Sequence, residues 1–103
     1  MLHRNLRHIR RGDRWYRFRS ESLLGESLLG QKKFDEAEPH LIAGYEGMKQ
    51  HAAKIPAPFK HYLTEAGERV VRLYDDWGKP EEAAEWRARL ARELPAENKE
   101  PKP

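Results

Sequence analysis

Two apolar stripes with helical spacing limit the fold of this chain more than any other feature. In both stripes, small and large apolar residues recur at steps of three and four positions. The first stripe consists of Phe34, Ala37, Leu41, Gly44, Tyr45 and Met48, and the second of Tyr62, Ala66, Val70, Leu73, Tyr74 and Trp77. A period near 3.6 residues places each stripe on one face of an α-helix. Because each face needs a partner, the sequence predicts helices that pack on one another.

Turn-forming residues divide the chain into four predicted helices, over residues 13–29, 35–54, 59–77 and 80–94. The links within the first pair and within the second pair are short, which forces the paired helices to be antiparallel. The expected fold class is therefore all-α, with two antiparallel helical hairpins. The predicted division is a basic N-terminal lead over 1–12, a first hairpin over 13–54, a linker over 55–58, a second hairpin over 59–94 and a disordered tail over 95–103.

Individual residues predict where these helices begin and end. Asp13 and Asp35 are expected to cap the first and second helices, with Pro39 in the first turn of the second, where a missing N–H costs nothing. Gly30 and Gly78 are expected to end the first and third helices, because glycine tolerates the left-handed backbone that follows a helix. The sequence thus predicts both hairpin turns from glycines.

Composition excludes several classes of protein. Valine and isoleucine are scarce, and charged residues make up 36% of the chain, which favours amphipathic helices over a sheet. The absence of cysteine removes disulfides, thiolate catalysis and cysteine-based metal sites. The five histidines lack the spacing of a zinc site, so no metal and no cofactor is expected. No apolar run approaches the ~18 residues of a membrane span, so a cytoplasmic location is predicted.

Charge is distributed unevenly along the chain. Residues 1–19 contain seven arginines and only Asp13 as an acid, whereas the remainder is mildly acidic. A basic arm of this kind is compatible with binding to nucleic acid or to an acidic surface. We keep this as an alternative function, although clusters of arginine are more often simply solvated.

The two predicted hairpins match each other in sequence. Ala37 and Ala83, the small residues expected where helices cross, are 46 residues apart. The repeated positions are Leu24, Gly25, Leu28, Phe34, Ala37, Leu41, Gly44, Val70, Tyr74, Gly78, Ala83 and Trp86. This pattern resembles the tetratricopeptide repeat, in which a small residue lets two helices approach to about 8–10 Å. The period exceeds the usual ~34 residues, and residues 54–60 lengthen the connection.

A more specific resemblance covers residues 22–49 well and residues 15–90 more weakly. This stretch resembles the C-terminal repeat region of large bacterial serine/threonine protein kinases of the planctomycete type. The resemblance implies a detached or C-terminal part of a kinase-associated repeat array. The chain has no Gly-rich loop, no strand lysine, no H-R-D loop and no D-F-G motif. We therefore expect that the chain is not an enzyme.

The resemblance implies a protein–protein interaction module whose groove is lined by the first helix of each hairpin. The candidate partner-binding residues are Arg19, Ser22, Glu26, Leu29, Glu65, Glu68, Arg72 and Asp75. Ser22 and Glu26 stand where chaperone-binding members use Lys and Asn, so binding of a C-terminal carboxylate is not expected. The partner is a protein or peptide of unknown identity, and neither nucleic acid nor membrane is the expected partner.

Two further expectations concern the ends of the hairpin pair. The helix over 15–29 has more apolar residues than one neighbour can cover, so it is predicted to meet another repeat or a second copy. The helix over 80–94 is polar enough to act as a cap. A third interpretation of the chain, as a truncated or mis-started gene fragment without independent function, also stays open.

Overall fold

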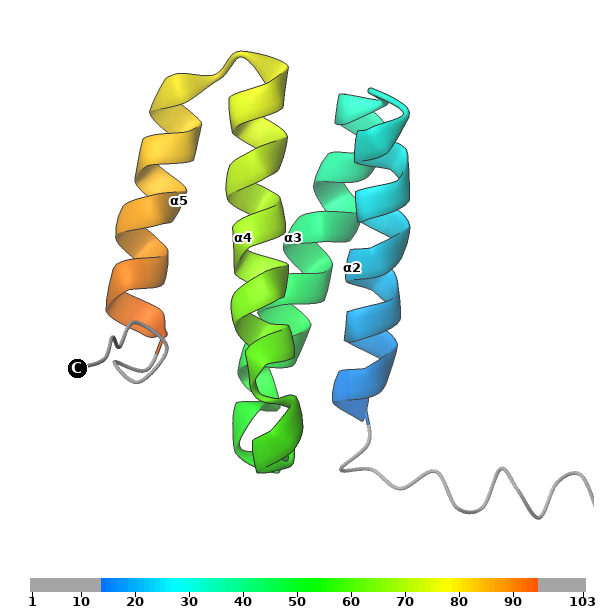
Figure 1. Ribbon diagram of the computed structural model, residues 1–103, viewed down its shortest axis with the longest axis vertical. Helices are drawn as coiled ribbons and strands as arrows, with labels where there is room; N and C mark the ends of the chain where they lie inside the picture. The colour runs from blue at the N-terminus through cyan, green and yellow to red at the C-terminus, as the bar shows by residue number, and fades with distance from the viewer. Residues whose placement is uncertain (1–13, 95–103) are drawn as a thin grey trace, which may run out of the picture.

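The computed structural model describes residues 14–94, and within this range every regular element is helical. The elements are α2 (Arg14–Gly30), α3 (Phe34–Gln50), η2 (Ala52–Lys54), η3 (Ala57–Phe59), α4 (His61–Trp77) and α5 (Pro80–Glu93). The four α-helices lie side by side and successive helices run in opposite directions (Figure 1). The predicted all-α arrangement with neighbouring helices packed together is confirmed. The predicted lead over 1–12, the cap Asp13 and the tail over 95–103 lie outside the described residues.

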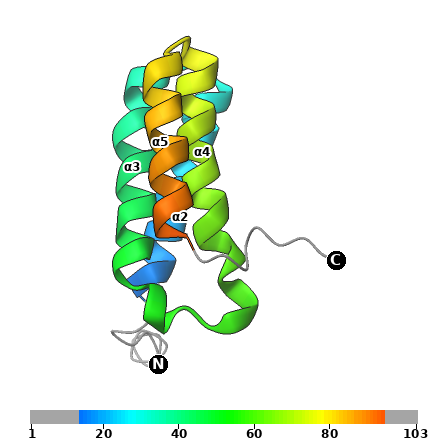
Figure 2. The ribbon, with the colours of Figure 1, turned by 90° about the vertical axis from the view of Figure 1, so that its left-hand side faces the viewer.

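The helices pack in chain order, with α3 and α4 at the centre. α3 contacts both α2 and α4, and α4 contacts α5 as well as α2. Seen from the α5 side, α5 lies in front of α3 and α4 (Figure 2). Helices α2 and α5 therefore form the two opposite sides of the molecule, each with one uncovered surface.

The two predicted stripes supply most of the core, which also contains Trp15, Leu29, Ile55, Leu63, Ala83 and Leu90. Seven stripe residues are fully buried, namely Ala37, Leu41, Tyr45 and Met48 of α3 and Ala66, Val70 and Leu73 of α4. Burial of such side chains is the main favourable contribution to folding, at about 1.5–3 kcal/mol for a large aliphatic residue. Leu24, expected among the packed repeat positions, is instead 48% exposed.

Both hairpin turns use the same backbone motif. In the first, the N–H of Lys33 donates to the carbonyl of Leu28 and Lys32 has a left-handed φ of 64°. In the second, the N–H of Lys79 donates to the carbonyl of Tyr74 and Gly78 has a φ of 78°. These are Schellman motifs. The prediction for Gly78 is confirmed, whereas the left-handed residue of the first turn is Lys32 and Gly30 remains inside α2.

The predicted start of α3 is wrong in two details. Lys33, and not Asp35, is the cap residue, because its carbonyl accepts the N–H of Ala37 at 2.9 Å. Pro39 is consequently the sixth residue of α3 and lies beyond the first turn, so the carbonyl of Asp35 loses its usual helical donor. Asp35 and Pro39 are both exposed, and water can therefore reach the carbonyl of Asp35.

The link between the hairpins is longer than the predicted linker over 55–58 and contains two short helices. α3 ends at Gln50, four residues before the expected end, and the one-turn helices η2 and η3 follow. α4 begins at His61, since Phe59 belongs to η3. Ile55 between the two short turns is buried, and its side chain anchors the link to the core.

Candidate protein-interaction surface

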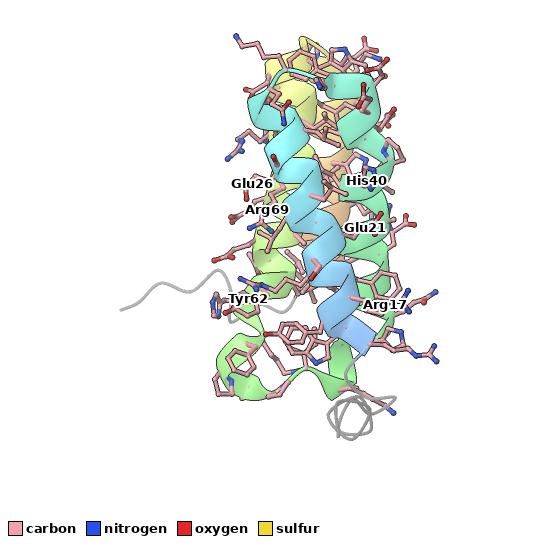
Figure 3. The ribbon with its side chains drawn as sticks, turned by 90° about the vertical axis from the view of Figure 1, so that its right-hand side faces the viewer. Arg17, Glu21, Glu26, His40, Tyr62 and Arg69 are labelled. Atoms are coloured by element: carbon pink, nitrogen blue, oxygen red, sulfur yellow. The ribbon has the colours of Figure 1, made fainter. Side chains whose placement is uncertain are left out.

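A row of charged side chains follows the seam between α2 and α4, and Arg69 of α4 is its centre (Figure 3). Arg69 donates from Nη1 to the hydroxyl of Ser22 at 3.1 Å. Its Nε lies 3.2 Å from the Glu26 carboxylate, without the angle of a hydrogen bond, and Nη2 lies 3.9 Å from Glu65. The side chain of Arg69 is only 13% exposed, so it ties α2 to α4.

The outer part of this row is accessible to a partner. Glu26 lies between Arg69 and Arg72, with its carboxylate 3.6 Å from the Arg72 guanidinium. Arg72 is half exposed and Glu26 is about one-third exposed. Ion pairs with this exposure contribute little to stability, about 0–1 kcal/mol. Their charged groups can therefore exchange partners at small cost. We call the row of Glu26, Glu65, Arg69 and Arg72 the charged seam.

The structure separates the eight predicted partner-binding residues. Arg19, Glu26, Glu65 and Arg72 lie together along α2 and α4. Ser22 and Leu29 are buried, because they lie on the part of α2 that packs on the neighbouring helices, and they cannot present side chains to a partner. Glu68 and Asp75 face α5, where Asp75 pairs with Arg87 at 2.6 Å. The sequence therefore predicts one groove, whereas the accessible candidates lie on two surfaces, one along α2 and α4 and the other between α4 and α5.

At one end of the charged seam, five residues line a hollow of about 270 Å³: Trp15, Tyr16, Pro56, Phe59 and Tyr62. The Trp15 ring centre lies 4.9 Å from that of Tyr16 and 6.0 Å from that of Phe59. Tyr16 is 56% exposed and Phe59 is 40% exposed, whereas Trp15 is buried and forms the floor. We call this feature the aromatic hollow. The hollow is not among the sites expected from the sequence, although the paired aromatic residues at 15–16 and 59–62 are a signal for it.

Arg19 connects the aromatic hollow to the charged seam. Its guanidinium carbon lies 3.8 Å from the centre of the Tyr62 ring, within the range of a cation–π contact. This contact holds a positive charge beside the rings and fixes the orientation of Tyr62. A ligand in the hollow would thus meet ring faces and a cation together.

The end of the molecule that carries the aromatic hollow is basic. Residues 14–20 and 49–64 contain six lysines and arginines and no acid, and both segments lie at the lower end of the bundle in Figure 1. At the opposite end, residues 32–38 and 75–82 contain three lysines and seven carboxylates. Charge is therefore separated along the long axis of the bundle, which the linear sequence does not reveal.

Two tyrosine–glutamate pairs hold the helices together away from this surface. Tyr45 of α3 donates to Glu93 of α5 at 2.8 Å, and Tyr74 of α4 donates to Glu38 of α3 at 2.6 Å. Burial, followed by the hydrogen bond to the carboxylate, raises the pKa of each tyrosine hydroxyl. Burial alone would raise the pKa of Glu93, but hydrogen bonds from Tyr45 and Arg89 outweigh it and lower that pKa. Both tyrosines thus stay protonated donors.

Other kinds of site have no support in the described part of the chain. Residues 14–94 contain no cluster of three histidines or acids that could hold a metal ion. His40 instead pairs with Glu21 at 2.7 Å across α2 and α3 (Figure 3). None of the helices in this range is long and apolar enough to cross a membrane. No family model, no curated protein and no solved structure matches the chain.

Proposed function

We propose that this chain is a protein–protein interaction module formed by two tetratricopeptide-like hairpins. The observation that carries the proposal is the continuous surface across α2 and α4, where the aromatic hollow adjoins the charged seam. α2 and α4 are the first helices of the two hairpins, as in a repeat that binds its partner on that side. The shared turn motif and the buried alanines Ala37 and Ala83 support the repeat assignment.

The chemistry of this surface favours an extended peptide as partner. The aromatic hollow suits a proline or an aromatic side chain, because flat ring faces bind both through large apolar contacts. Arg14, Arg17 and Lys60 in the basic segments suit acidic residues next to this anchor. The charged seam contains acids as well as bases and would bind the polar remainder of the peptide.

The relation to bacterial serine/threonine kinases is part of the proposal. It is supported by the sequence pattern over residues 22–49, and it describes the chain as a repeat region associated with a kinase. In this proposal the chain has no catalytic role and supplies binding only.

Selection from a peptide library displayed on phage tests the peptide-binding function. We expect the selected sequences to combine an aromatic residue or proline with neighbouring Asp or Glu. A synthetic peptide of the selected sequence, titrated by fluorescence anisotropy, should bind Phe59→Ser at least about tenfold more weakly than the wild-type chain. Leu24→Ser is the matched control, since Leu24 is similarly exposed but lies outside the hollow.

Two outcomes would contradict the proposal. One is that no sequence is enriched in the selection. The other is that Phe59→Ser and Leu24→Ser bind the selected peptide equally well, because the hollow would then contribute nothing to recognition.

Single-stranded nucleic acid is a second candidate ligand, favoured by the basic segments 14–20 and 49–64, which contain no acid, and by the exposed rings beside them. Aromatic rings that stack on bases, with cations for the phosphates, are typical of such binding. The acids of the charged seam argue against a strand that continues along α2 and α4. Filter binding of a single-stranded oligonucleotide at about 50 and 200 mM salt separates the two ligands, since phosphate binding weakens steeply with salt.

A further inference from the structure

Equivalent positions in the two hairpins, related by the 46-residue repeat, differ sharply in burial on α2 and α4. Tyr16 of α2 is 56% exposed and its equivalent, Tyr62 of α4, is partly buried. Leu24 is 48% exposed and its equivalent Val70 is fully buried. The same contrast holds for exposed Ser20 against buried Ala66 and for exposed Ser27 against buried Leu73. α4 buries this face against the first hairpin, whereas α2 leaves it open to solvent. We call Tyr16, Ser20, Leu24 and Ser27 the front face.

The opposite side of the molecule shows the reverse contrast. A groove of about 340 Å³ lies between α4 and α5 and is lined mainly by apolar side chains, among them Val71, Leu90 and Leu94. Four of the groove residues that are exposed or only partly buried, Glu68, Arg87, Ala91 and Leu94, have buried equivalents in the first hairpin. These equivalents are Ser22, Leu41, Tyr45 and Met48. The last helix, expected from its charges to be a polar cap, instead leaves this groove open. We call it the rear groove.

The first hairpin itself shows what kind of element fits such a groove. The surface of α2 and α3 that is equivalent to the rear groove is covered by the second hairpin, with α4 in contact with both helices. The element that covers it is thus the first helix of a hairpin of this type. The chain contains one other such helix, α2, and the face that would enter the groove is its open front face.

We propose that copies of this chain associate head to tail, with the front face of α2 of one copy seated in the rear groove of the next. The contact would repeat between copies the packing that joins the two hairpins within one copy. The front face belongs to α2 and the rear groove to α4 and α5, and Figures 2 and 3 show α5 and α2 on opposite sides of the molecule. One copy can therefore bind a neighbour on each side. Such a heterologous contact leaves a free surface at each end of a pair, so oligomers larger than a dimer form as the concentration rises. Ser20 and Ser27 replace Ala66 and Leu73 in this contact, which makes it weaker than the internal one.

Two single substitutions test this contact without touching the core. Leu24→Glu places a charge on the front face, and Ala91→Glu places one in the rear groove, where Ala91 is exposed. Ala43→Glu, at an exposed alanine of α3 that belongs to neither surface, is the matched control. Circular dichroism first establishes that all three variants keep the helical content of the wild-type chain.

Sedimentation velocity of the full chain over about a hundred-fold range of concentration is the measurement. The weight-average sedimentation coefficient should rise with concentration for the wild-type chain and for Ala43→Glu, and stay at the monomer value for each surface variant. A mixture of Leu24→Glu and Ala91→Glu should form a one-to-one dimer and nothing larger, because each retains the surface that the other lacks. This complementation distinguishes a head-to-tail contact from a symmetric one.

Three results would overturn the proposal. The wild-type chain could sediment as a monomer at every concentration, which would leave the two surfaces to another protein or to further repeats. Association could persist in both surface variants, or the mixture of the two could stay monomeric. The proposed contact shares the repeat assignment and Tyr16 with the proposed function, but it does not depend on peptide binding. A chain that stays monomeric could still bind the selected peptide, so the two failures are distinguishable.

Discussion

Lys32 and Gly78 occupy equivalent places in the two hairpin turns, 46 residues apart, and both have a left-handed backbone. Each is followed by a lysine whose N–H closes the turn at 2.8–2.9 Å. A side chain makes this backbone conformation unfavourable by about 1–2 kcal/mol, because the Cβ crowds the carbonyl oxygen. The first turn therefore contains strain that the second avoids.

Replacement of Lys32 by glycine should stabilise the chain by roughly 0.5–1 kcal/mol. The free energy gained by relief of the strain exceeds the free-energy cost of the extra backbone entropy that glycine loses on folding. Gly78→Ala should destabilise the chain by a similar or larger amount for the same reason. Urea unfolding monitored at 222 nm measures both changes, and opposite shifts of the two midpoints are the expected result. Shifts in the same direction would contradict the shared turn motif.

Gly44→Ala should destabilise the chain by about 1–3 kcal/mol, a typical cost of overpacking. A Cβ at Gly44 would lie 2.8 Å from both the Cβ and the backbone nitrogen of Ser22, and the backbone of α2 cannot yield easily. Gly30→Ala is the control, because nothing lies within 4 Å of its added Cβ and alanine favours the helix. Thermal melts should move in opposite directions, and equal destabilisation would show that the close approach of α2 and α3 is not limiting.

Ala37→Leu and Ala83→Leu should each destabilise the chain far more than Ala52→Leu. Ala37 and Ala83 are fully buried at the helix crossings, where added methylenes cost about 1–3 kcal/mol, whereas Ala52 is only partly buried in η2. Urea midpoints measured for the three variants decide the matter. Equal midpoints would remove the main structural argument for a repeat.

Glu93→Gln should destabilise the chain by about 1–2 kcal/mol at neutral pH, because Tyr45 and Arg89 lose a charged acceptor. The folded chain lowers the pKa of Glu93, so its contribution is complete above the unfolded value of about 4.3 and decreases as the pH falls through the folded pKa. The stability difference between wild type and variant should thus be constant from neutral pH to about 5 and shrink below about 4. Glu85→Gln, at an exposed position of the same helix, should show no such dependence.

Periodicity was sufficient to predict the two central helices and most of the core, whereas the outer two helices were predicted from turn-forming residues. The stripe from Phe34 to Met48 and the stripe from Tyr62 to Trp77 predict α3 and α4, because burial of one face depends on local spacing alone. The left-handed backbone of Lys32 was not predicted, because glycine is the residue expected in this conformation. The prediction therefore ended the helix at Gly30, two positions earlier. The strain at Lys32 is tolerated because the Schellman hydrogen bonds fix the turn.

The candidate surface was less predictable, since it depends on how α2 and α4 lie against each other. Arg69 was not singled out, yet it organises the charged seam through contacts to Ser22 and Glu26. The aromatic hollow depends on the short turn η3, which brings Phe59 beside Trp15. The spacing of residues within one helix does not show which side chains of different helices come together.

The separation of charge along the bundle also affects how fast partners meet. A molecule with bases at one end and acids at the other has a dipole along its long axis, and an approaching negative partner is turned toward the basic end before contact. Such steering speeds association without strengthening the bound state. Added salt should therefore slow the association of an acidic peptide while its dissociation rate changes little, and the tip carrying Tyr16 and Phe59 would be the part of the molecule that arrives first.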